Sequence, residues 1–145
     1  MGLDDVPQAM EIASRLPDAP QWPQDVYLNA LDPKRTPARI AMVAEDLSGE
    51  ISGFLITVLI PPQAELETIA VAPAARRQGI GTRLLAEMLT VLKQKHVTEV
   101  MLEVRDSNHS ARSFYAAAGW IENGRRDGYY PDPEEDAILM SRHID

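Results

Sequence analysis

The chain has 145 residues, of which 45% are hydrophobic and 25% charged, a mixture typical of one soluble globular domain spanning residues 1–145. The absence of cysteine excludes disulfides, a thiol nucleophile and thiolate metal sites, and the formal net charge of −8 argues against a general nucleic-acid binder. No apolar run approaches the roughly 20 residues of a membrane span, and the acidic N-terminus does not resemble a signal peptide. We therefore expect a cytoplasmic protein that does not bind membranes.

The first part of the chain is expected to be helical. Apolar residues at helical spacing predict a helix over residues 3–16, and a second helix is expected over residues 24–31. Pro17, Pro20 and Pro23 break the chain between them into an irregular segment around Trp22.

Three β-strands are expected next. Residues 39–45 and 52–60 are rich in β-branched side chains and flank a turn at residues 48–50, so they predict an antiparallel hairpin. Residues 65–71 predict a third, buried strand, which Pro73 ends because proline donates no ladder hydrogen bond.

The second half of the chain alternates helices and strands. A long amphipathic helix is predicted around Leu84–Leu92, a strand over residues 98–104, and a second helix that Gly119 stops. Residues 120–123 and 137–140 are predicted to be the last strands, joined by a polar, proline-broken loop over residues 124–136. The element order predicts a mixed α/β domain.

The turn between the third strand and the long helix has the features of an anion site. Gly79 and Gly81 permit close backbone approach, and the first N–H groups of the helix lack helical acceptors. The helix dipole adds partial positive charge at the same place. Arg76, Arg77 and Arg83 form a cationic patch without an intervening acid. The turn therefore fits a phosphate or pyrophosphate, the alternative being a tight connection with surface arginines.

Two common phosphate motifs do not match this turn. A nucleotide P-loop needs Lys after its last glycine, where this chain has Thr82. A dinucleotide fingerprint needs a third glycine at the position of Leu84. The pattern Arg-x-x-Gly-x-Gly, formed by Arg76, Gly79 and Gly81, instead resembles the acetyl-coenzyme A signature of the GNAT N-acetyltransferases.

The resemblance extends to other segments. Residues 102–108 (LEVRDSN) and 114–120 (FYAAAGW) look like the second half of the GNAT core. With residues 67–71 and 128–140 they are similar to the RimI-type ribosomal-protein alanine N-acetyltransferases. The likeness is strong over residues 65–141 and weak over residues 3–60. It implies the GNAT fold, a mixed, mostly antiparallel sheet flanked by helices.

The resemblance also implies how acetyl-CoA, the cosubstrate, is held. The backbone of the third strand would pair with the pantetheine amides, and a backbone N–H near Val71 would stabilise the oxyanion. The turn would surround the pyrophosphate, and Asn108 would cap the following helix, contact the cofactor, or do both. The cofactor-binding residues expected are Ile69, Ala70, Val71, Arg76, Arg77, Gln78, Gly79, Ile80, Gly81, Thr82 and Asn108.

Amine acetylation needs a base, because a free α-amine with a pKa of about 8 is mostly protonated at neutral pH. Glu103 is the first choice, since it lies on the polar face of a predicted strand just before a loop. The resemblance implies the same role, often through water. Glu67 is the rival base and Glu65 a weaker one. The alternative for Glu103 is a surface glutamate or a salt-bridged one, with Arg105 as a candidate partner.

Tyr115 is the candidate general acid, because a phenol with a pKa of about 10 can protonate a departing thiolate. The alternative is an ordinary core tyrosine whose hydroxyl is satisfied elsewhere.

The acceptor side is less defined by the sequence. Tyr129 and Tyr130, with Trp22 and Glu67, are expected to line the site of a peptide N-terminus. The resemblance implies direct attack by the α-amine of a ribosomal protein in a ternary complex. The alternatives are a lysine or small-molecule amine, and a non-catalytic acetyl-CoA-binding module.

Other partners are expected to be few. The three histidines are scattered along the chain, so we expect no metal site. We also expect the protein to be a monomer or a weak homodimer. GNAT chains usually begin with a strand, whereas here only Met1–Leu3 precedes the first predicted helix. Either that strand is vestigial, or the chain begins inside the family's first element.

Overall fold

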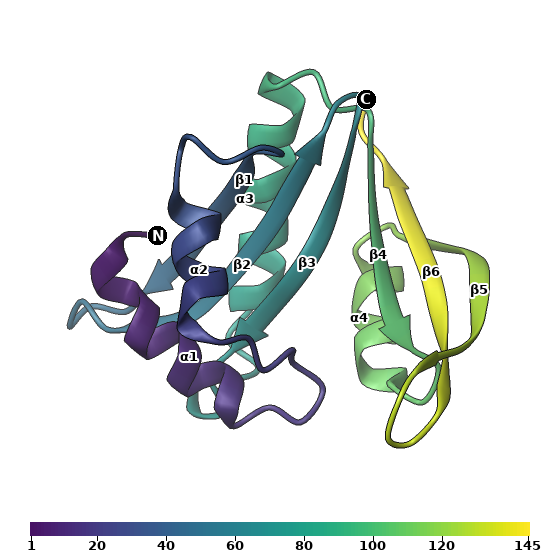
Figure 1. Cartoon of the computed structure of the whole chain (residues 1–145), viewed down its shortest axis with the longest axis horizontal. Coiled ribbons are helices and arrows are strands. Elements are labelled where there is room, and N and C mark those ends of the chain that lie inside the picture. The colour runs from purple at the N-terminus through teal and green to yellow at the C-terminus, as the bar shows by residue number, and fades with distance from the viewer.

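Six strands form one sheet with helices on both faces in the computed structural model, which describes residues 1–145 (Figure 1). The helices are α1 (Val6–Ser14), α2 (Gln24–Leu31), α3 (Ile80–Gln94) and α4 (His109–Ala117). The strands are β1 (Arg39–Glu45), β2 (Ile51–Ile60), β3 (Gln63–Val71), β4 (Glu99–Arg105), β5 (Ile121–Tyr130) and β6 (Glu135–His143). Their order is β1-β2-β3-β4-β6-β5, and only β3 and β4 are parallel. The predicted mixed, mostly antiparallel sheet is confirmed.

Two hydrophobic layers hold the helices to the sheet. In Figure 1, α1 and α2 lie over β1–β3, and α3 and α4 lie on the opposite face. The strand β2 is apolar on both faces, as a strand covered on both sides must be. Phe54 and Ile56 pack in the layer of α1 and α2, whereas Leu55 packs with Met88 of α3 in the other layer. Full burial of side chains such as Phe54 and Met88 contributes about 1.5–3 kcal/mol each.

The predicted helices and the first hairpin are confirmed. α2 has the predicted bounds, and the first helix is divided into a 3₁₀ turn at Leu3–Asp5 and α1. Gly119 follows α4 with a φ of 92°, as a left-handed helix stop requires. No strand precedes α1, and no helix is long and apolar enough to cross a membrane.

The predicted loop over residues 124–136 is wrong, because most of it belongs to the hairpin of β5 and β6. Nine of the ten residues of β5 are exposed, so this edge strand lacks the apolar alternation by which a strand is recognised. Polar contacts hold it instead, including a 2.6 Å ion pair between Arg125 and Asp136 on β6.

A β-bulge in β3 changes the direction in which its side chains point. Ile56 of β2 pairs with Thr68 and the next residue, Thr57, pairs with Leu66, so Glu67 is an extra residue. Before the bulge, Leu66 packs in the layer of α3, whereas Ala70 beyond it packs in the layer of α1 and α2. The bulge therefore exchanges the two faces of β3 halfway along the strand.

β3 and β4 are joined over only a short length. Their parallel pairing covers residues 63–65 of β3 and 99–101 of β4. Beyond these pairs the two strands diverge, which Figure 1 shows as a widening gap between the two halves of the sheet. The later part of β3 thus has hydrogen-bonding partners on the β2 side only.

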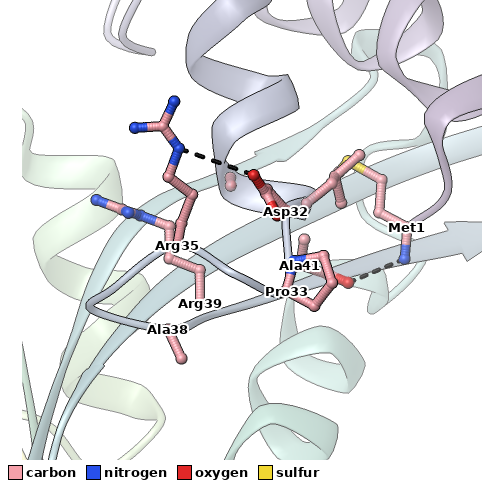
Figure 2. A pocket seen from close by; sticks show the side chains of 9 residues that line it. Met1, Asp32, Pro33, Arg35, Ala38, Arg39 and Ala41 are labelled. Carbon is pink, nitrogen blue, oxygen red and sulfur yellow. Dashed lines mark hydrogen bonds and ion pairs between the residues drawn. The ribbon is translucent and has the colours of Figure 1, made fainter.

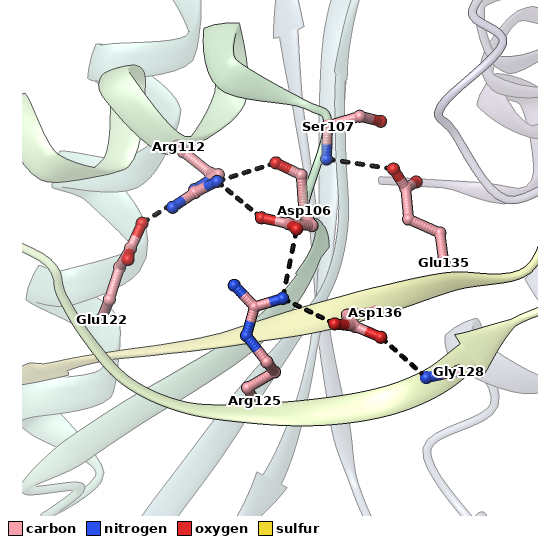
Figure 3. Close-up of polar contacts among 8 residues, drawn as sticks. All are labelled: Asp106, Ser107, Arg112, Glu122, Arg125, Gly128, Glu135 and Asp136. Carbon is pink, nitrogen blue, oxygen red and sulfur yellow. Dashed lines mark hydrogen bonds and ion pairs between the residues drawn. The ribbon is translucent and has the colours of Figure 1, made fainter.

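An ion-pair network holds the far end of β4 to α4, β5 and β6 (Figure 3). Asp106 accepts hydrogen bonds from Arg112 at 2.9 Å and from Arg125 at 3.1 Å. Asp136 accepts from Arg125 and from the Gly128 N–H at 2.9 Å. The network fixes the β5–β6 hairpin against the rest of the sheet without a hydrophobic core on its outer side.

We expect this network to weaken in acid. The Arg112 guanidinium lowers the pKa of Glu122, the Ser107 hydrogen bonds lower the pKa of Glu135, and the Gly128 amide and Arg125 lower the pKa of Asp136. A carboxyl whose pKa is lowered by folding stabilises the protein above its unfolded pKa, about 4, and that stabilisation is lost as pH falls through the folded value. The Tm should therefore decrease steeply below about pH 4.

Thermal unfolding between pH 7 and pH 3 checks this expectation. Asp136→Asn should lower the Tm at pH 7 and reduce its decrease in acid. Glu87→Gln is the control, because Glu87 is exposed on α3 and forms no ion pair. Equal acid sensitivity of Asp136→Asn and wild type would contradict the expectation.

Candidate active site

A cleft of about 1050 Å³ lies where β3 and β4 separate. Its walls come from the later part of β3, the turn and first residues of α3, the end of β4, the inner side of α4, and residues 16–20 between α1 and α2. This volume is at the upper end of the range usual for ligand sites.

Most of the residues predicted from the sequence line this cleft. Those that do are Glu67, Ile69, Ala70, Val71, Arg76, Arg77, Gly79, Ile80, Gly81, Thr82, Glu103, Asn108, Tyr115 and Tyr130. Gln78, Trp22 and Tyr129 are not part of its lining. Trp22 packs edge-on against Tyr27 instead, with ring centroids 5.7 Å apart.

The turn before α3 is built to present amide groups. Arg77 and Gly79 both have left-handed backbones, with φ of 66° and 74°, a conformation that is strained for arginine. The N–H groups of residues 77–82 have no acceptor within the chain. Arg76, Arg77 and Arg83 are exposed and form no ion pair. Free amides, free guanidinium groups and the start of a 15-residue helix together make a site for a polyanion.

Gly81 is required by packing against α4. A Cβ at this position would lie 3.1 Å from the Phe114 ring, which is closer than an ordinary contact. Phe114 also lines the cleft, so it joins the turn of α3 to the inner surface of α4.

The unpaired side of β3 provides a second binding feature. Beyond Glu65 no strand pairs with β3 on the side facing β4, and Ile69, Ala70 and Val71 line the cleft there. Peptide groups at such an edge can pair with an extended ligand that contains amides.

Asn108 has the predicted capping role. Its Oδ1 accepts a hydrogen bond from the Ala111 N–H at 3.1 Å and so begins α4. Its side-chain NH₂ has no partner within the chain and belongs to a residue that lines the cleft. Capping and ligand contact are therefore compatible.

Three carboxylates lie together on the side of the sheet that faces away from α3. Glu67 forms a 2.7 Å ion pair with Arg39, and Glu103 forms a 3.3 Å ion pair with Arg126. Burial raises the pKa of Glu65, and the charges of Glu103 and Glu67 raise it further. This part of β3 and β4 therefore brings three acidic side chains close together.

Glu103 is salt-bridged, as the alternative expected, but its partner is Arg126 and not Arg105. Arg105 contacts Glu135 at 3.3 Å and donates to the carbonyls of Pro131 and Pro133. Its guanidinium lies 4.4 Å from the centre of the Tyr130 ring, a cation–π contact. Arg105 thus holds the turn that carries Tyr130 beside the cleft.

The tyrosines near the cleft stay protonated at neutral pH. Burial raises the pKa of Tyr115, whose ring packs between Phe114 and Trp120 at centroid distances of 5.3 and 5.7 Å. Burial, followed by the charge of Glu103, raises the pKa of Tyr130 to about 12. A hydrogen bond with Glu103 raises the pKa of Tyr129, which is 49% exposed.

Some parts of the site could not be found from the sequence. Residues 16–20 line the cleft, although their prolines indicated only a break between helices. Arg39 and Arg126 form ion pairs with two candidate bases, Glu67 and Glu103, from strands far away in the chain. Only the register of the sheet brings these pairs together.

A smaller pocket of about 250 Å³ lies between the end of α2 and β1 (Figure 2). The Met1 ammonium donates to the Ala41 carbonyl at 2.9 Å beside it, and Asp32 pairs loosely with Arg35 at 3.8 Å. Arg39 lines this pocket and also reaches Glu67 in the main cleft. One ion pair thus joins a residue that lines the smaller pocket, Arg39, to a residue that lines the cleft, Glu67.

A sheet opened between two parallel strands, with a free-amide turn beside the opening, suits an extended ligand that has amides along its length and a polyanionic end. Residues 7–120 match the Acetyltransferase (GNAT) family. The chain belongs to this family, and it is an N-acetyltransferase that takes its acetyl group from acetyl-CoA.

Particular relatives resemble the chain closely. It is 32% identical over 146 residues to the [ribosomal protein bS18]-alanine N-acetyltransferase of Salmonella typhimurium, which covers 99% of this chain and 95% of that protein. It is 39% identical over 99 residues to the protein of the same name from Escherichia coli K12, 67% of each chain. The crystal structure of the ribosomal-protein-S18-alanine N-acetyltransferase from Escherichia coli matches 99% of this chain and 90% of that one, with a TM-score of 0.86 and 31% identity.

The left-handed glycine at position 79 offers a test of the turn. Gly79→Ala should weaken acetyl-CoA binding about five-fold, because left-handed alanine costs about 1 kcal/mol and the turn would relax away from the binding shape. Isothermal titration calorimetry measures this affinity.

Gly49→Ala is the matched control. Gly49 also has a positive φ, 89°, and like Gly79 has no atom within 4 Å of its missing Cβ, but it lies in the β1–β2 turn. Both variants should lower the Tm similarly while only Gly79→Ala weakens binding. Equal acetyl-CoA affinities of the two variants would refute a role for the turn.

Proposed function

We propose that this N-acetyltransferase acetylates the α-amine of a protein N-terminus, namely the alanine of ribosomal protein bS18. The observation that carries the proposal is the match to the Escherichia coli enzyme over 99% of the chain, which includes the acceptor-side segment 16–20 and the β5–β6 hairpin. The names of the relatives from Escherichia coli K12 and Salmonella typhimurium give the same acceptor.

The chemistry requires two proton transfers that residues of the cleft can perform. The neutral amine nitrogen attacks the thioester carbonyl, a C–N bond forms and the C–S bond breaks. Glu103 accepts the proton that the amine nitrogen loses, directly or through water, and Tyr115 donates a proton to the departing thiolate. Starting from an ammonium, the products are an amide, coenzyme A with a free thiol, and one proton released to solvent.

Glu103 is a better base than Glu67 because of the cations beside them. The ion pair of Glu67 with Arg39 is short, 2.7 Å, and both side chains are largely covered. This carboxylate would have to break a close contact with a guanidinium before it could accept a proton. The hydrogen bond with Glu67 also raises the pKa of Arg39. The partner of Glu103 is farther away and more exposed. Glu65 does not line the cleft.

The assignment of the base predicts different results for two isosteric variants. Glu103→Gln should lower kcat about 10²–10⁴-fold, the usual contribution of a general base, with acetyl-CoA affinity unchanged. Glu67→Gln keeps the shape of the strand bulge and should change kcat much less. An equal loss in Glu67→Gln would move the role of base to Glu67.

The acceptor is tested by release of the coenzyme A thiol. We expect turnover with a free Ala-starting peptide of bS18 and none with its N-terminally blocked copy carrying lysine or with a small polyamine. Turnover with the blocked peptide or polyamine would contradict the α-amine acceptor. Acetyl-CoA binding without turnover of any acceptor would contradict catalysis.

A further inference from the structure

Glu103 is not free in this structure, since it is in contact with a guanidinium. The Nε of Arg126 on β5 lies 3.3 Å from Oε1 of Glu103. The nearby cations are otherwise engaged, because Arg39 is paired with Glu67 and Arg105 with Glu135. Arg126 is therefore the cation that neutralises the proposed base.

The contact between Arg126 and Glu103 is easily broken. The Arg126 side chain is 56% exposed, its contact with Glu103 is long, and the geometry of this contact is not that of a hydrogen bond. Exposed ion pairs of this kind contribute about 1 kcal/mol or less. Its neighbour Arg125 differs, because it donates to both Asp106 and Asp136.

The backbone next to Arg126 leaves the regular sheet. Arg126 pairs with Ala137 and Tyr130 pairs with Glu135, so three residues of β5 lie opposite one residue of β6. Arg126 is the last residue before this irregularity. Its guanidinium also lies 5.5 Å from the centre of the exposed Tyr129 ring, so this cation–π contact can keep the cation nearby when the contact with Glu103 breaks.

We propose that Arg126 occupies the position of the acceptor ammonium on Glu103 and that the acceptor displaces it from Glu103, leaving it on Tyr129. The proposal rests on the proposed function, because it assumes a cationic amine as the acceptor and Glu103 as its partner. The incoming ammonium replaces one positive charge with another, so the partly covered carboxylate always has a cation beside it. A neutral N-terminus cannot make this exchange.

This exchange makes Arg126 a positioning residue that competes with the acceptor ammonium for Glu103. Because an amine must first displace Arg126 from Glu103, its affinity is lowered by the free energy of the Arg126–Glu103 contact. A contact worth about 1 kcal/mol lowers the affinity about five-fold. Removal of the guanidinium should thus strengthen amine binding without changing the chemistry of transfer.

The probe for this inference is alaninamide, a minimal free α-amine, with N-acetylalaninamide as its uncharged counterpart. Calorimetry would measure their affinities for the enzyme saturated with coenzyme A, where no transfer occurs. Arg126→Gln should bind alaninamide about three- to five-fold more tightly than wild type, and Arg126→Lys should restore the wild-type affinity. N-acetylalaninamide should bind equally to all three proteins.

Arg125→Gln is the matched control. It removes the same charge from the adjacent position of β5, whose carboxylate partners do not line the cleft. Its alaninamide affinity should stay within two-fold of wild type. In kinetics with the Ala-starting peptide, Arg126→Gln should lower KM by the same factor and leave kcat unchanged.

Alaninamide affinity that is unchanged or weaker in Arg126→Gln would overturn the inference. Failure of alaninamide to bind any variant would overturn both the inference and the proposed function. Tighter binding in Arg126→Gln, with wild-type turnover restricted to lysine or polyamine acceptors, would overturn the proposed function alone.

Discussion

The separation of β3 from β4 is the constraint on which the rest of the site depends. Only residues 63–65 of β3 pair with residues 99–101 of β4, so each strand leaves the other with unpaired backbone groups. Those groups must find partners, and a ligand with amides of its own can supply them. The same separation makes room for the turn of α3 and for α4 to face each other across the cleft.

The site divides its charge between two ends. The donor end has exposed arginines without ion pairs beside free amides, which suits a polyanion despite the net charge of −8. The end that we propose for the acceptor has three carboxylates with different surroundings. Glu67 pairs closely with Arg39, Glu103 has a longer contact with Arg126, and Glu65 is partly desolvated. A transfer from a polyanionic donor to a cationic acceptor uses both ends at once.

Local signals in the sequence predicted the helices, the first hairpin and the turn of α3, because each depends on residues close together in the chain. They did not predict β5, whose exposed edge has no apolar alternation. The bulge at Glu67 was also hidden, because burial along β3 still alternates through it. Ion pairs such as Arg126 with Glu103 depend on strand register, which a pattern within one segment does not contain.

The most direct test of the central claim is amide hydrogen exchange with and without acetyl-CoA. We expect slower exchange in the cofactor complex within residues 69–71 of β3, whose edge away from β2 lines the cleft, and at residues 77–82 of the turn, whose N–H groups have no acceptor within the chain. Protection confined to other segments, with these amides unchanged, would show that the cofactor is not held between the separated strands.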